Sequence, residues 1–208
     1  MMTDIQNALN KLVEGFTEDS FINLISTKTG DFLPDTAVLS LELNENTNFE
    51  TIKQVGIIQT PIEEKLLVAS IEVKSELNEK SGRKAQYDLA KRLLKSVHYD
   101  SFEAGVFAFH DSSGSFRLSL VYAESIGQKR LWNNFKRFTF FVTKEEGITN
   151  KTFKNQIESG DFSSFEGIKE TFSIAAVTDL FYSEFLEIYN ALVQDFKVVN
   201  KLSDNDKA

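Results

Sequence analysis

Several residue types that often carry chemistry are scarce in this sequence. Its 208 residues include no cysteine, two prolines and two histidines. The absence of cysteine excludes disulfide bonds, cysteine nucleophiles and thiolate metal sites, and it fits a reducing compartment. The histidines, His98 and His110, lie far apart in the sequence, and neither has a partner histidine at helical spacing. Both are therefore expected at ordinary positions on the surface or at a helix end.

Long apolar runs and common sequence motifs are missing as well. No run approaches the roughly 18 residues of a membrane-spanning helix, and the N-terminus lacks the basic-then-apolar order of a signal peptide. We expect a cytoplasmic protein without membrane contact. The chain contains no Gly-x-Gly-x-x-Gly, no Walker loop and no Gly-x-Ser-x-Gly. Because neither Pro34 nor Pro61 lies in an Asn-Pro-Pro-Tyr-like tetrad, this chain does not itself carry an amino-methyltransferase active site.

Charge is distributed unevenly along the chain. The net charge of −8 argues against a globally basic nucleic-acid binder. However, residues 80–95 hold six basic residues and one acid, and residues 128–137 hold four basic residues and no acid. From residue 161 onward, nine acids face four lysines. A local basic face on an acidic protein suits a nucleic acid, and it equally suits an acidic neighbouring domain.

The order of helical and alternating patterns predicts the fold class. Strands are expected at 21–26, 37–43, 49–59, 66–74, 104–109, 116–122 and 137–143. Helices are expected near the N-terminus with a cap at Thr3 or Asp4, at 83–97, 150–158 and 163–171, and from about 175 onward. We expect an α/β (α+β) fold in which helices flank a central mixed, largely antiparallel sheet and a helical segment follows at the C-terminus.

The stretch from Leu66 to Lys95 holds the candidate catalytic residues. A buried strand ends in Glu72 and Lys74, and a basic amphipathic helix follows after a short loop. An acid and a lysine two residues apart at a strand end are typical of metal-dependent nucleases of the PD-(D/E)xK type. The acid binds a divalent ion such as Mg²⁺, and the lysine orients water or steadies phosphate charge. The alternative is a solvated strand edge.

A site of this type also needs a carboxylate on the neighbouring strand. If the hairpin turn is centred near residue 63, Glu72 faces Gln54, and Glu50 lies about four residues away, roughly 13 Å. On that register no carboxylate reaches Glu72. A different register, a β-bulge or an acid on another strand end, such as Asp111, would supply one.

The helix offers a set of candidate DNA contacts. Lys84, Lys91 and Lys95 fall on one line of the helix, opposite its apolar side. Ser81 and Arg83 at its start present free backbone N–H groups and positive charge to a phosphate. We expect Arg117 and Arg137 to join this patch. The alternatives are a solvated lysine face and surface salt bridges.

Several segments together resemble a known protein family. GSFRLSL, KRFTFFV and ETFSIAAVTDLFYSEF are the most specific of them, and the pattern covers roughly residues 49–196. It resembles the N-terminal region of type IIG restriction–modification enzymes and related large bacterial adenine-specific DNA methyltransferases. In those proteins this region precedes a helical linker and a methyltransferase domain.

The resemblance implies a role in DNA restriction and modification. It implies double-stranded DNA as partner, with S-adenosylmethionine used by a methyltransferase domain downstream in the full-length protein. It carries over Glu72 and Lys74 as endonuclease residues. We expect a nuclease-like domain at 1–145, a helical extension at 146–200 and a linker at 201–208. The alternative is a non-catalytic scaffold that docks the methyltransferase domain or a partner subunit.

Overall fold

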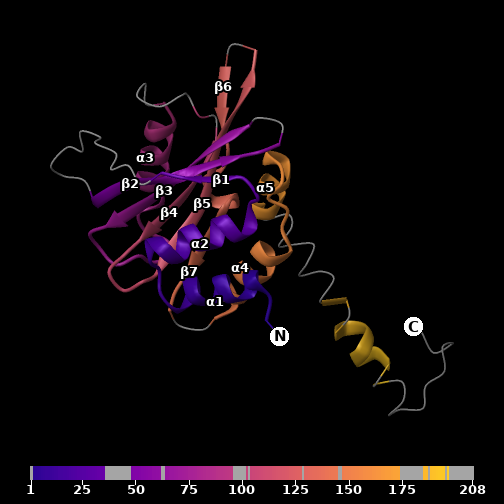
Figure 1. The fold of residues 1–208 in the computed structure, drawn as a ribbon. Helices are drawn as coiled ribbons and strands as arrows, with labels where there is room; N and C mark the ends of the chain where they lie inside the picture. The colour runs from indigo at the N-terminus through magenta and orange to yellow at the C-terminus, as the bar shows by residue number, and fades with distance from the viewer. Residues whose placement is uncertain are drawn as a thin grey trace. The chain divides into compact units, whose positions relative to one another are not determined.

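The computed structural model describes residues 2–35, 48–61, 64–95, 102, 104–127, 129–144, 147–173, 185–186, 188–194 and 196. The chain divides into two compact units, Met1–Ser173 and Ile174–Ala208. The first unit is a mixed seven-stranded sheet with helices on both faces (Figure 1). The predicted α/β fold with a largely antiparallel sheet is confirmed.

The sheet contains one parallel pair in its middle. Its strands are β1 (Phe32–Pro34), β2 (Phe49–Gln59), β3 (Lys65–Val73), β4 (Ala104–His110), β5 (Phe116–Ile126), β6 (Lys129–Trp132) and β7 (Thr139–Val142). Their order is β1-β2-β3-β4-β5-β6, and β7 also pairs with β5. Only β3 and β4 are parallel among these pairs. A parallel pair needs a long crossover connection, and the helix α3 (Arg83–Lys95) lies in that connection.

One face of the sheet carries the larger hydrophobic core. The helices α1 (Asp4–Glu14), α2 (Glu18–Lys28), α4 (Ile148–Ser159) and α5 (Phe165–Phe172) all contribute to it. Phe21, Phe153 and Phe172 are fully buried there. We call this side of the sheet the helical face. Each aromatic of this size removes a large apolar area from water, so this face dominates the hydrophobic stabilisation.

The other face, which we call the α3 face, is covered mainly by that helix (Figure 1). Leu89 and Leu93 of α3 are buried against Ile71, Phe107 and Phe109 of the central strands. The predicted division of the helix into an apolar side on the sheet and a basic side outside is confirmed.

The segment after α1 differs from its prediction as a strand. It forms α2, because Thr17 and Ser20 build a reciprocal cap in which each side-chain oxygen accepts the other residue's backbone N–H. Phe21, Leu24 and Ile25 then follow at helical spacing and are buried. Between the expected strands at 21–26 and 37–43 lies the short strand β1. The predicted strand at 37–43 lies outside the described residues.

The later elements mostly match their predictions, with two differences. The basic stretch at 128–137, where no strand is expected before 137, contains the strand β6. The helix α5, expected from residue 163, begins at Phe165, and its cap is Ser164, whose side chain accepts the Gly167 N–H. Helical residues occur between 185 and 196, within the predicted C-terminal helix.

The helices α4 and α5 belong to the same compact unit as the sheet. Phe153 of α4 and Phe172 of α5 lie in the core with residues of α1 and β5. The first unit therefore extends to Ser173. The domain boundary predicted at residue 145 falls inside this unit, because the sheet needs these two helices to cover its helical face.

Candidate functional site

Glu72 lies in a row of residues that crosses the middle of the sheet. On β2 it is paired with Thr51, and on the parallel strand β4 it is paired with His110. Residues paired across strands point to the same side, so this row lies on the helical face, where Phe116, paired with His110, is buried. The carboxyl ends of two parallel strands thus place a carboxylate and an imidazole side by side.

The predicted position of Glu50 relative to Glu72 is wrong. The strand β2 has register shifts between Phe49 and Thr51 and between Gln54 and Gly56. The turn is also centred one residue earlier than predicted, since Gln59 pairs with Lys65. As a result Glu72 faces Thr51, and Glu50 is the extra residue of a bulge beside that pair.

The bulge changes the chemistry available at this edge. Val73 faces Phe49, which is buried on the α3 face, while Thr51 faces Glu72 on the helical face. Glu50 stands between them and is exposed. Bulges commonly re-aim a side chain next to functional sites. The second acidic residue that the hairpin register had excluded therefore lies on the strand adjacent to Glu72.

Two charged residues that the sequence did not single out join this row. Lys53 of β2 lies one alternation step from Thr51, and its Nζ is 3.0 Å from Oε2 of Glu18 in the first turn of α2. Both side chains are about one-third exposed, at 39% and 28%. The connection between α1 and α2 brings Glu18 to the sheet, and no spacing in the sequence indicates this.

His110 is half-buried and in contact with an aromatic ring. Its imidazole stacks on Phe16 with a centroid distance of 4.3 Å and an interplanar angle of 16°. Burial lowers the pKa of His110 below its usual range, the carboxylates of Glu72, Asp111 and Glu18 oppose that shift, and Lys53 adds to it. The expectation of an ordinary surface histidine is wrong, because His110 is half-buried and its ring stacks on Phe16, in the connection between α1 and α2.

Lys74 and Asp111 occupy different positions at this edge. Lys74 follows β3 directly, is exposed, and donates its backbone N–H to Asn48 O at 2.9 Å. Asp111 is buried and accepts the backbone N–H groups of Leu77, Ser113 and Ser115 at 2.6, 2.9 and 3.2 Å. Its carboxylate therefore holds the turn after β4 and the loop after β3.

The candidate DNA contacts on α3 lie on the opposite face from this row. Ser81, Lys84 and Lys95 are exposed, and Arg83 is half-buried. Lys91 pairs with Asp88 at 2.7 Å and lies 4.3 Å from the ring centroid of Tyr87, and Lys95 lies 5.3 Å from that of Trp132. These cations line the outside of the helix, but α3 and the sheet separate them from the side chain of Glu72.

The prediction of Arg117 as a surface phosphate contact is wrong. Its side chain is fully buried on the α3 face, and the guanidinium donates to Gln86 Oε1 and to Asn78 O, the latter at 2.7 Å. Burial, with a further contribution from Arg83, lowers its pKa to about 10, and Glu79 opposes the shift. Arg117 holds the loop that leads into α3. Arg137, expected with it, is exposed at the end of the 3₁₀ helix η1 (Phe135–Arg137).

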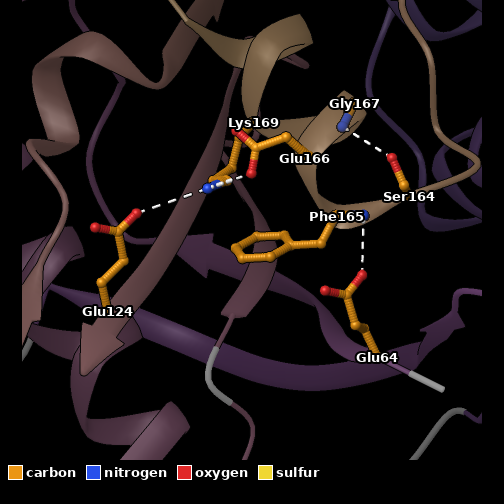
Figure 2. Close-up of polar contacts among 7 residues, drawn as sticks. All are labelled: Glu64, Glu124, Ser164, Phe165, Glu166, Gly167 and Lys169. Carbon is orange, nitrogen blue, oxygen red and sulfur yellow. Dashed lines mark hydrogen bonds and ion pairs between the residues drawn. The ribbon is translucent and has the colours of Figure 1, made fainter. Parts of the chain in front are cut away.

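A further polar cluster caps α5. Figure 2 shows Glu64, at the start of β3, accepting the Phe165 N–H at 3.2 Å. Lys169 of the same helix lies 2.6 Å from Glu166 and 3.6 Å from Glu124. The carboxylate of Glu64 stabilises a helix start where backbone N–H groups lack partners. These contacts fasten α5 to the sheet.

The carboxylate oxygens near Glu72 suit a hard cation that takes few of its ligands from the protein. Among the described residues, no group of three or more histidine, aspartate or glutamate side chains is placed to hold a metal ion. Mg²⁺ usually binds through one or two carboxylates, with water and substrate phosphates completing its shell. Glu72 and Glu50 are two carboxylates on adjacent strands, which is the number that this mode of binding uses.

Comparison with protein-family models, with curated proteins and with solved structures gave no match to this chain. None of the described helices is long and apolar enough to span a bilayer.

Proposed function

We propose that this chain is the N-terminal, DNA-contacting domain of a restriction–modification DNA methyltransferase, and that its Glu72 edge cleaves DNA with Mg²⁺. The observation that carries the proposal is the bulge of β2, which sets Glu50 beside the pair of Thr51 and Glu72. The Glu-x-Lys order at the end of β3 and the resemblance of residues 49–196 support the same class. S-adenosylmethionine belongs to the methyltransferase domain downstream in the full-length protein.

The residues divide the chemistry of hydrolysis between them. Glu72 and Glu50 would hold Mg²⁺, which activates water and neutralises phosphate charge when bound. Lys74, exposed directly after the strand, stabilises the negative charge on the scissile phosphate. Lys53, held by Glu18, adds a fixed positive charge to the same face.

The test is cleavage of supercoiled plasmid DNA with Mg²⁺, on the chain with E72Q or K74Q. We expect each variant to lower the cleavage rate by about 100-fold or more, as for loss of a group that acts on transition-state charge. EDTA should stop the wild-type reaction. Matched controls are E170Q on α5 and K65Q at the opposite end of β3, and both should cleave at the wild-type rate. Equal rates for E72Q and the wild type would reject this site.

The alternative is a non-catalytic scaffold that docks the methyltransferase domain or a partner subunit. One observation favours it: the basic residues Lys84 and Lys95 of α3 lie on the opposite face of the sheet from Glu72. It predicts that the wild-type chain leaves the plasmid intact at every Mg²⁺ concentration. Cleavage that E72Q abolishes and E170Q retains would contradict the scaffold.

A further inference from the structure

An open groove of about 990 Å³ runs between α1 and α4. Its lining includes four lysines, four asparagines and one glutamate, in a chain whose net charge is −8. The charged residues are Lys11, Lys144, Lys151, Lys154 and Glu14. From this concentration of positive charge on an acidic protein we infer that the groove binds the phosphate backbone of DNA.

The groove is built from ordered elements. Lys11 lies in the last turn of α1, and Lys151 and Lys154 lie on α4, whose Phe153 anchors that helix in the core. Lys154 Nζ donates to Asn10 Oδ1 at 2.9 Å, so one cation is held in place across the two helices. Lys11, Lys144 and Lys151 are exposed and available to a ligand.

One lysine of the groove lies close to the segment that contacts the row of Glu72. Lys144 packs so closely on the backbone of Gly15 and Gly114 that a side-chain carbon added there would lie 3.2 and 2.8 Å from its Cε atom. Gly15 directly precedes Phe16, whose ring stacks on His110, the β4 partner of Glu72. The groove and Glu72 therefore share the helical face, whereas the lysines of α3 lie behind the sheet.

The lining matches the chemistry of a nucleic-acid backbone. Lysine binds phosphate as a point charge, and asparagine amides donate to phosphate and sugar oxygens. Such contacts position a duplex without reading its sequence. The inference rests on the proposed DNA-contacting function and deepens it, because it names this groove, in place of the α3 lysines, as the surface that contacts DNA.

The experiment compares two variants of equal charge change. The groove variant carries K11Q, K144Q and K151Q, and the α3 variant carries K84Q, R92Q and K95Q, all at exposed positions. Binding of a fluorescein-labelled 30-base-pair duplex is measured by anisotropy from low to moderate salt. Thermal unfolding confirms that both variants fold. A third variant with arginine at the three groove positions retains the charge.

We expect the groove variant to raise Kd about tenfold or more and to flatten the slope of log K against log salt by about 2 to 3. The α3 variant should bind within about threefold of the wild type, and the arginine variant should retain binding. Wild-type affinity in the groove variant together with weakened binding in the α3 variant would overturn the inference and leave the proposed DNA contact intact. A wild-type chain without salt-dependent binding would overturn both.

Discussion

The two faces of the sheet hold their buried positive charge in different ways. On the α3 face, Arg117 is fully buried and its guanidinium donates to loop carbonyls and to Gln86. On the helical face, Lys53 is half-buried and pairs with Glu18 next to Glu72 and His110. The first cation fastens a loop and has no access to solvent. The second is partly exposed and belongs to the polar row that contains Glu72.

This difference separates structural from chemical roles in one sheet. A buried guanidinium whose donors meet backbone oxygens stabilises one conformation of the loop before α3. A partly exposed group of carboxylates, lysine and imidazole has the composition of a catalytic or ion-binding site. Burial and hydrogen-bond partners therefore distinguish Arg117 from Lys53, two basic strand residues that look equivalent in the sequence.

The helical face should fail entirely without α4 and α5. A chain that ends at residue 145 lacks Phe153, Ile168 and Phe172, which are buried in the main core. Loss of one buried phenylalanine costs about 3–5 kcal/mol. Loss of two therefore removes most of the free energy of unfolding of a typical domain, which is about 5–15 kcal/mol. We expect no cooperative unfolding by circular dichroism. A chain that ends at Ser173 is the control, and it should unfold cooperatively.

On the α3 face, R117M should give the largest effect of a single substitution described here. It leaves Gln86 Oε1 and the Asn78 carbonyl without their donors, and we expect a loss of about 2–3 kcal/mol in the free energy of unfolding. Urea denaturation measures this. The matched control is R137M, an exposed arginine, whose effect should stay within about 0.5 kcal/mol. Equal effects would show that Arg117 is not needed to hold the loop.

At the edge of the helical face, E64A should remove a cap from α5. The Phe165 N–H loses its acceptor, and we expect a loss of about 1 kcal/mol in the free energy of unfolding. The control is E166A, which removes an exposed ion pair with Lys169 and should cost no more than about 0.5 kcal/mol. A larger loss for E166A would contradict the capping role.

The smallest effect concerns His110 and acid pH. Its pKa in the folded protein lies below the ordinary 6.5, chiefly because of burial. As the pH falls below about 6.5, the unfolded chain takes up the proton first, so stability falls as the pH falls towards the lower folded pKa. H110Q should lose less stability between pH 7 and pH 5 than the wild type. An equal loss of stability in H110Q and the wild type over this range would contradict the prediction.

Much of the fold follows from periodicity in the sequence. The alternation in 49–59 and the helical spacing in 83–95 reflect which side chains are buried. The spacing of apolar residues along the sequence shows this directly. The segment at 21–26 was assigned wrongly, because a short apolar run fits both a strand and a helix. Its cap at Thr17 and Ser20 was the signal that favoured the helix.

The site was harder to predict than the fold. The register of β2 against β3 depends on two irregularities in the pairing. Counting paired residues outward from the hairpin turn cannot reveal them. Glu18 reaches Lys53 of this row through the tertiary packing of α2. His110 lies beside Glu72 through the parallel pairing of β3 with β4. The burial of Arg117 could not be predicted, because alternation shows which residues share a face but not which face a helix covers.

The bulge at Glu50 also bears on how such a domain changes over generations. Phe49 and Thr51 already pair with consecutive residues of β3. Removal of Glu50 would therefore leave regular pairing at this position, and all remaining side chains would keep their present faces. A single-codon deletion would then remove one carboxylate while the sheet kept its pairing. The number of acids at this edge can therefore change without a change in the fold of the sheet.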